Sequence, residues 1–242
     1  MAYLPITLGI ARAPAKGAQA SAKKKGRSQN GTPSSSSGKI TPELKKQVLE
    51  RDGYACQYCG FESKKYQEVQ PRNNNPADMT LANLATACIF CHQCFNLDTV
   101  GAMTSGTLIW LPEISQADLH HVARAVYVGR ISQGPVADAA RKTHEILMAR
   151  REEASKRIGT DNPYILSTVL RDYLNDDAYA QREKKLRGVR LLPIDRRLIK
   201  EADLEFNQFP QILAYWRSKD GPFGGKIPGQ WLSIYQDVVK AA

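Results

Sequence analysis

Long apolar runs are missing from this chain of 242 residues. No stretch approaches the roughly 18 consecutive apolar residues of a membrane span, so direct membrane insertion is not expected. The first residues also lack a charged start followed by a long apolar stretch, so a secretory signal peptide is not expected. The 42% of hydrophobic residues nevertheless predict a folded protein with a substantial core.

Acidic residues are absent from the first 39 positions, which hold seven basic residues. This segment supplies +7 of the net charge of +10, and the rest carries 27 basic and 24 acidic side chains. The excess charge therefore belongs mainly to a tail, which weakens nucleic-acid binding as the main function. Because residues 11–39 hold few large apolar side chains, we expect a disordered linker. Contact of its KKKGR run with phosphate or an acidic partner is the alternative.

Histidine is scarce, with four residues in the chain and none before position 92. That part of the chain therefore offers no imidazole to accept a proton in catalysis. His120, His121 and His144 lie on predicted helices without partners at ligand spacing. We interpret these three as surface or core residues, not as metal ligands.

Cysteine is rare as well, but four of the five residues are grouped. Cys56 and Cys59 form one C-x-x-C pair, Cys88 and Cys91 form another, and 28 residues separate the pairs. Two such knuckles complete a tetrahedral four-sulfur site, so the spacing predicts a single Zn²⁺ ion bound by these residues. A redox pair, two disulfides, or reduced cysteines packed as small hydrophobic residues are the alternatives.

A site closed by four sulfurs has no position for water or substrate, so this zinc is expected to be structural. Cysteines at metal spacing also favour a reducing compartment, and we expect a cytoplasmic protein. His92 follows Cys91 directly and is an alternative ligand, although we expect it to be half-exposed. Cys94 is expected to be a buried thiol, since a tetrahedral site has no room for a fifth ligand.

The hydrophobic pattern predicts a mostly helical α+β protein. We divide it into an N-terminal strand or anchor (1–10), the linker (11–39), a zinc module (40–112), a helical region (113–204) and an aromatic C-terminal extension (205–242). Thr41 is a predicted helix N-cap, and Ser115 is another, with Asp118 completing a capping box. GTLIWLPE, residues 106–113, predicts a strand, and residues 61–80 predict a short hairpin and loop. Helices are predicted at 81–87, 136–157, 176–187 and 194–206.

The segments VLERDGYACQYCG and LANLATACIFCH resemble the zinc module of HNH endonucleases. Arg51-Asp52-Gly53 stands before the first cysteine pair, Asn83-Leu84 before the second, and His92 after it. The resemblance implies an HNH-like fold, of the treble-clef or ββα type.

The catalytic histidine of that module has no counterpart here. The family spacing places it near Glu68-Val69-Gln70, where no side chain accepts a proton as imidazole does. We therefore assign no catalytic residue and expect no enzyme activity. A metal-dependent HNH-type DNA endonuclease that uses Glu68, Asn83 and His92 is the alternative.

A longer series closely resembles the DotN (IcmJ) family: RDGYACQYCGF, LANLATACIFCHQCF, VGAMTSGTLIWLPEISQADL and later RLLP. The resemblance implies a non-catalytic zinc scaffold in the coupling complex of the type IVB (Dot/Icm) secretion system, which recruits protein substrates. The implied partners are the C-terminal tail of the coupling ATPase DotL and the other coupling-complex subunits. A cytoplasmic location, peripheral to the inner membrane through that partner, is also implied.

The linker at 11–39 and the aromatic end from about residue 205 depart from the family pattern, as does His92. Service in a conjugative system instead of an effector-exporting one is therefore an open alternative. A nucleic-acid-binding role without chemistry would use the tail and Arg182, Lys184, Lys185, Arg187 and Arg190. Candidate interface anchors are Trp110, Leu111, Trp216 and Trp231, although such residues more often belong to the core.

Overall fold

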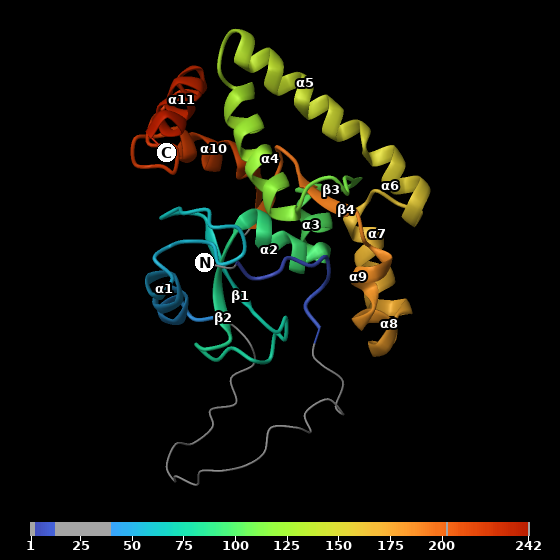
Figure 1. Ribbon diagram of the computed structural model, residues 1–242. Helices are drawn as coiled ribbons and strands as arrows, with labels where there is room; N and C mark the ends of the chain where they lie inside the picture. Colours follow the sequence, from blue (N-terminus) through green and yellow to red (C-terminus); the bar gives the residue numbers. More distant parts are fainter. Residues whose placement is uncertain (1–2, 13–39, 202, 242) are drawn as a thin grey trace.

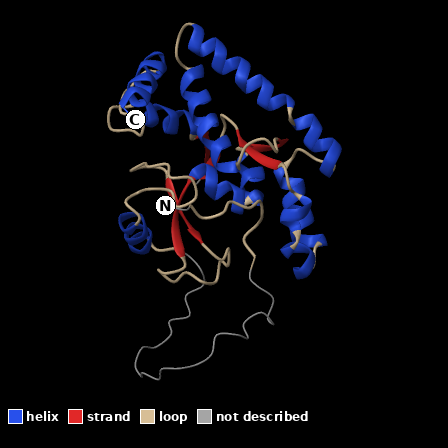
Figure 2. Ribbon diagram, in the orientation of Figure 1, coloured by secondary structure: helices blue, strands red, loops and turns tan. Residues whose placement is uncertain are grey.

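The computed structural model describes residues 3–12, 40–201 and 203–241 (Figure 1). Apart from positions 11 and 12, the predicted linker lies outside the described residues. Helices dominate the described part, where the strands pair as antiparallel two-stranded sheets (Figure 2). This mixture confirms the helix-rich α+β class. None of the helices in these ranges combines the length and the apolar character that a bilayer crossing requires.

The zinc-module region begins with a helix, a hairpin and two further helices. These are α1 (Pro42–Arg51), β1 (Gln67–Pro71), β2 (Leu84–Cys88), α2 (Ile89–Phe95) and α3 (Leu97–Met103). Thr41 caps α1 as predicted, and its Oγ1 accepts a hydrogen bond from the Leu44 N–H at 3.2 Å. In Figure 1, α1 lies beside the hairpin, and α2 continues directly from the end of β2.

The predicted helix at 81–87 is wrong, because residues 84–88 form β2. Leucine and alanine favour helix locally, but antiparallel pairing with β1 decides the outcome here. All five residues of β2 are buried, and Leu84 packs with Val48 of α1 and Val69 of β1. The hairpin predicted within 61–80 therefore returns later than expected, after a long loop.

The middle of the chain is a helical layer around a second sheet. Its elements are β3 (Gly106–Trp110), α4 (Gln116–Arg130), α5 (Pro135–Ala149), α6 (Arg151–Ile158), α7 (Pro163–Thr168), the π-helical turn η1 (Val169–Tyr173), α8 (Asp176–Ala180), α9 (Arg182–Lys185) and β4 (Val189–Pro193). The strand predicted near 106–113 is confirmed, as is the capping box of Ser115 and Asp118. The long helices α4 and α5 form an antiparallel pair (Figure 1).

Three further helix predictions need correction. The single helix predicted at 136–157 is divided at Arg150 into α5 and α6. The helix predicted at 176–187 is two short helices, α8 and α9. The helix predicted at 194–206 is instead a hairpin of β5 (Leu198–Glu201) and β6 (Leu204–Asn207), joined in register from Leu198–Asn207 to Glu201–Leu204. Charged and apolar residues alternate in this segment, a pattern that suits a partly exposed strand as well as one face of a helix. The local pattern therefore does not distinguish a strand from a helix here.

The C-terminal part contains α10 (Phe209–Arg217), the 3₁₀ turn η2 (Pro228–Gln230) and α11 (Trp231–Ala241). Trp216 of α10 is 1% exposed and meets Phe61, Phe90 and Phe209 edge-on. The aromatic extension is therefore part of the same core as the cysteine knuckles. On α11, by contrast, Tyr235 is exposed.

Residues 3–12 run as an extended segment outside the sheets and are tied to both halves of the molecule. The Gly9 N–H donates to the Cys94 carbonyl at 2.8 Å, and the Gly9 carbonyl accepts from the Leu97 N–H at 3.0 Å. On the other side, the Tyr179 hydroxyl donates to the Ile10 carbonyl at 2.9 Å. This segment therefore fixes α2 and α3 relative to the helices beyond residue 160.

Candidate metal centre

The first cysteine knuckle is a tight turn that follows α1. The Cys56 N–H donates to the Phe61 carbonyl at 3.0 Å, and the Gly60 N–H donates to the Cys56 carbonyl at 2.8 Å. Gly60 has a φ of +74°, a left-handed conformation that glycine adopts without steric cost. This turn directs Cys56 and Cys59 toward one point.

The second knuckle lies where β2 passes into α2. Cys88 ends the strand and is the N-cap of the helix, and its Sγ accepts a hydrogen bond from the Cys91 N–H at 3.4 Å. β2 pairs with β1 on one side. It also holds the first knuckle beside this junction, since the Gln57 N–H donates to the Thr86 carbonyl at 2.9 Å. The fold therefore joins two pairs that are far apart in sequence.

The ligand atoms of Cys56, Cys59, Cys88 and Cys91 all lie within 4.8 Å of one another, and all four residues are buried. None of the five cysteines of the chain is in a disulfide, so the disulfide alternative is wrong. The Cys59 and Cys88 sulfurs are 3.7 Å apart. A tetrahedron with Zn–S bonds of about 2.3 Å has sulfur–sulfur edges of about 3.8 Å. The donor set and its spacing therefore fit a metal ion of this type.

Helix α4 provides buried groups that contact these sulfurs. Arg124 donates from Nη2 to the Cys88 Sγ at 2.7 Å and to the Cys59 Sγ at 3.7 Å. Burial opposes ionisation of Cys88, but hydrogen bonds within the cysteine cluster and the charge of Arg124 lower its pKa well below the usual value. A metal-binding thiolate is favoured at this position.

His120 lies one turn before Arg124 and is fully buried. Its Nε2 is 2.9 Å from the Gln116 amide nitrogen, which can only donate, so Nε2 is the acceptor of that pair. Nδ1 then carries the proton and donates to the Cys91 Sγ at 3.3 Å. Burial lowers the pKa of His120 to about 3, which keeps the imidazole neutral.

The sequence pattern does not predict that His120 and Arg124 contact the cysteine sulfurs. His120 is a core residue, as one of the two sequence interpretations held, but its contact with a candidate ligand was not expected. The available signal was the position of Arg124 on the apolar face of its helix, between Leu119 and Tyr127. His121 contacts the first knuckle too, since its Nε2 lies 2.9 Å from the Cys59 carbonyl.

Cys94 is a buried thiol, as predicted. Its Sγ lies 3.8 Å from the His120 Nε2, and it is outside the group of four cysteines. His92 is half-buried, and burial is the main cause that lowers its pKa.

The segment Glu68-Val69-Gln70, singled out by the sequence resemblance to HNH endonucleases, contributes Glu68 to an ion-pair cluster. Glu68 lies in β1, and its carboxylate accepts a hydrogen bond from Lys45 of α1 at 2.8 Å and lies 3.9 Å from Arg197. Burial opposes its ionisation, but the charge and the hydrogen bond of Lys45, together with the charges of His92 and Arg197, lower the pKa of Glu68. Val69 packs on the other face of the strand, toward α1.

Asn83 does not join Glu68 and His92. Its side-chain amide donates to Asn73 and to the Asp78 carbonyl, at 2.9 and 2.8 Å, and so stabilises the loop between β1 and β2. Glu68 is opposite Ala87 in the hairpin, three pairs away from the end that Asn83 precedes. The three residues of the nuclease alternative are thus not gathered at one point.

Two of the five basic residues suggested for nucleic acid, Arg182 and Arg190, have structural partners. Arg182 donates to the Leu8 carbonyl at 3.0 Å, and Arg190 donates to the Ile114 carbonyl at 2.9 Å. Of the candidate interface anchors, Trp216 and Leu111 are buried in the core, and Trp110 and Trp231 are half-buried.

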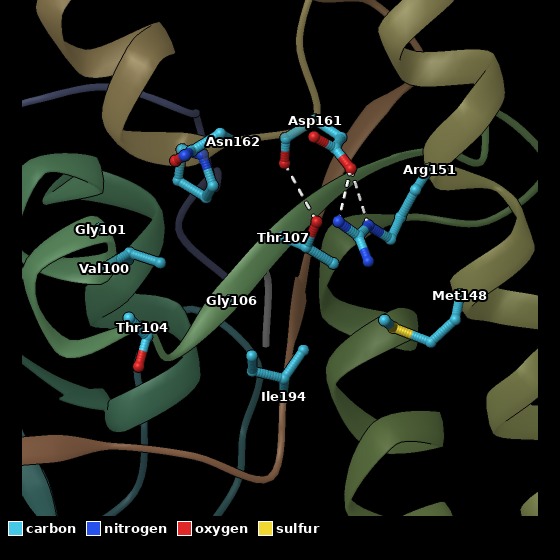
Figure 3. Close-up of a pocket in the computed structure, with 11 residues that line it drawn as sticks. Val100, Gly101, Thr104, Gly106, Thr107, Met148, Arg151, Asp161, Asn162 and Ile194 are labelled. Carbon is cyan, nitrogen blue, oxygen red and sulfur yellow. Dashed lines mark hydrogen bonds and ion pairs between the residues drawn. The ribbon is translucent and has the colours of Figure 1, made fainter.

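A hollow of about 240 Å³ lies between α3, β3, α6 and α7 (Figure 3). Arg151 and Asp161 form an ion pair at its edge, with a closest distance of 2.7 Å, and Thr107 donates to the Asp161 carbonyl. Among the described residues that line this hollow there is no histidine or cysteine. It therefore offers no second site of the kind formed by the cysteine cluster.

Fold and site define a mixed helix-and-sheet protein built around a buried four-cysteine cluster. No protein-family model matches the chain. It is 32% identical over 151 residues to the type 4 apparatus protein DotN of Legionella pneumophila subsp. pneumophila (strain Philadelphia 1), a match that covers 60% of this chain and 70% of that protein. The chain belongs to the DotN family.

Proposed function

We propose that this protein is a non-catalytic, zinc-stabilised scaffold subunit of a type IV secretion coupling complex. It binds the C-terminal extension of a DotL-like coupling ATPase and helps to recruit protein substrates for export. Through that partner it is held in the cytoplasm at the inner membrane. The observation that carries the proposal is membership of the DotN family, whose relative is named as a type 4 apparatus protein.

The order of elements supports an HNH-like module as the origin of this scaffold. A hairpin, β1–β2, leads directly into α2, which is the ββα order. One cysteine pair precedes the hairpin and the other lies at the strand–helix junction. In such a module the four sulfurs and their metal replace part of a hydrophobic core, so their function is to stabilise the fold.

The surroundings of Glu68 support the absence of catalysis. A nuclease of this type needs a carboxylate that is free to bind a divalent cation beside a proton acceptor. Here Lys45 and Arg197 provide the positive charge next to the Glu68 carboxylate, at 2.8 and 3.9 Å. A divalent cation would have to displace both.

An apolar groove of about 430 Å³ offers a place for a partner helix. Its apolar residues come from α6, α7, η1 and the segment around α9: Ile158, Leu166, Val169, Leu170, Leu174 and Leu186. Arg182 and Lys185 also line it. An amphipathic helix that carries acidic residues beside its apolar stripe matches this combination.

Co-purification with the C-terminal tail of the coupling ATPase from the same genome tests the proposal. We expect a stable complex, and we expect Val169→Glu to weaken it because a carboxylate would enter the groove. Val239→Glu on α11 is the matched control, since Val239 is also exposed. A tail that does not bind the wild-type protein contradicts the scaffold role.

One observation favours the nuclease alternative: His92 and Glu68 are close enough for the carboxylate charge to act on the pKa of the imidazole. Incubation of the pure protein with plasmid DNA and Mg²⁺ or Mn²⁺ tests it. We expect no cleavage, and cleavage that His92→Ala abolishes would establish the alternative. A steep loss of DNA affinity with salt would in turn support a nucleic-acid-binding role.

A further inference from the structure

A guanidinium group is buried against the cysteine cluster. Arg124 is 2% exposed, and its hydrogen-bond partners in the described structure are the sulfur atoms of Cys88 and Cys59, at 2.7 and 3.7 Å. Its Nε and Nη1 atoms are also buried and have no hydrogen-bond partner among the described residues. A cation in such a place is strongly unfavourable unless negative charge lies beside it.

Two aromatic rings hold this guanidinium in position. Its central carbon lies 3.9 Å from the ring centroid of Phe61 and 5.1 Å from that of Phe90. Phe61 follows the first knuckle and Phe90 lies within the second, so both walls belong to the metal module. The rings favour a cation over a neutral side chain and leave the sulfur atoms as its hydrogen-bond acceptors.

We infer that Arg124 is the buried counter-ion of the metal centre and makes the docking of α4 depend on the bound metal. Four thiolates around one divalent ion carry two net negative charges, which a single guanidinium partly balances. The inference rests on the metal occupancy put forward under the proposed function. It adds a partner residue outside the four ligands and a consequence for the rest of the fold.

That consequence follows from the position of Arg124 in the middle of α4. The four sulfur ligands lie within 4.8 Å of one another. A bound divalent ion would offset the repulsion between four thiolates at that separation. When it is removed, the sulfurs can separate, and Arg124 loses the organised acceptor that compensates its burial. Because α4 also packs against α5, β4 and α10, the loss reaches the helical part of the molecule.

Arg124→Met therefore has opposite effects in the two forms of the protein. With metal present, the variant lacks the counter-ion, and we expect its zinc affinity to fall about 10- to 100-fold. Without metal, the wild-type protein has a buried guanidinium with no organised negative charge beside it, whereas the variant has a neutral side chain there. We therefore expect α4 of the metal-free variant to be better protected from hydrogen exchange than α4 of the metal-free wild type. An ordinary packing residue would weaken both forms.

The test measures zinc affinity by competition with a chromophoric chelator. It also measures hydrogen exchange of residues 116–130 with and without zinc. Arg130→Met is the matched control, because Arg130 lies on the same helix but pairs with Asp195 at 3.1 Å, away from the sulfurs. The control is expected to leave zinc affinity within about twofold of wild type, well below the effect of losing a residue that contacts a ligand. A zinc affinity of Arg124→Met within that range, or equal losses of protection in both forms, would overturn the inference.

Two charge variants keep the test decisive if Arg124→Met does not fold. Arg124→Lys retains a positive charge and Arg124→Gln does not, so the lysine variant must bind zinc more tightly than the glutamine variant. Equal affinities would overturn the counter-ion role. Absence of metal from the wild-type protein would contradict the metal centre itself, so the two failures are distinguishable.

Discussion

The ammonium group of Lys45 lies 2.8 Å from the carboxylate of Glu68 and joins α1 to β1. The two side chains are 39% and 31% exposed, so solvent screens the pair only in part. Arg197 approaches the same carboxylate from the segment before β5. The Glu68 carboxylate therefore links α1, β1 and the segment before β5.

Replacement of Lys45 by methionine is expected to lower the free energy of unfolding by about 1 kcal/mol, because a half-buried carboxylate loses its main partner. Urea denaturation measures the change. Lys46→Met is the control, since Lys46 is 72% exposed and lies 3.8 Å from Glu50. Its cost is expected to stay below about 0.5 kcal/mol. Equal costs for the two variants would contradict the importance given to Glu68.

Cys59→Ser is expected to abolish stoichiometric zinc binding and most of the folded structure. Structural zinc contributes on the order of 10 kcal/mol to folding, more than the rest of a typical domain can replace. Metal content by mass spectrometry and circular dichroism measure the two effects.

Cys94→Ala provides the matched control, since Cys94 is equally buried but lies outside the cluster. It is expected to retain one zinc ion per chain. Loss of the ion from this variant, or its retention by Cys59→Ser, would mean that the ligand set is misassigned.

His144 is expected to make stability depend on pH. Burial lowers its pKa, the charge of Arg130 adds to this effect, and its Nε2 is buried without a hydrogen-bond partner among the described residues. The unfolded chain therefore binds the proton more readily than the folded chain. The contribution of His144 to the free energy of unfolding is fully present above the ordinary pKa of about 6.5 and is lost as the pH falls below it.

His144→Gln removes this contribution. As the pH is lowered from about 7.5 to about 5.5, across the ordinary histidine pKa, wild type is expected to lose this contribution and the variant is not. The free energy of unfolding of the variant minus that of wild type therefore increases as the pH falls. The other histidines are present in both proteins, so their contributions cancel in the difference. Urea denaturation at the two pH values measures it, and a difference independent of pH would show that His144 titrates as in the unfolded chain.

Trp216→Ala tests whether the aromatic extension belongs to the core. Truncation of a tryptophan that is 1% exposed is expected to cost about 3–5 kcal/mol. Tyr235→Ala, at a side chain that is 65% exposed, is expected to change stability by less than about 0.5 kcal/mol. Thermal or urea denaturation compares the two. A small effect of Trp216→Ala would indicate that α10 packs loosely on the knuckles.

Features that depend on neighbouring residues were predictable from the sequence. The caps at Thr41 and Ser115 act within three positions, so composition alone reveals them. The two C-x-x-C pairs likewise carry their geometry in a spacing of three, and the structure brings their sulfurs together.

Features that depend on distant partners were not predictable. Residues 84–88 form a strand because β1 is there to pair with them, although alanine and leucine would suit a helix. The strand at 189–193 pairs with β3, in a register that runs from Gly106–Pro193 to Trp110–Val189. Arg124 reaches the sulfurs from a helix that begins 25 residues after Cys91, and a periodic pattern shows a buried face without showing what it meets.

The extended segment at residues 3–12 has an implication for biosynthesis. The Ile10 carbonyl accepts its hydrogen bond from Tyr179, 169 positions later in the chain. During translation this segment emerges long before that partner exists, while its own Leu8 and Ile10 side chains are ones that end up buried. Closure of such a long-range contact is slow compared with local helix formation. Leu8 and Ile10 therefore stay without their final cover until the chain has been made at least as far as Tyr179.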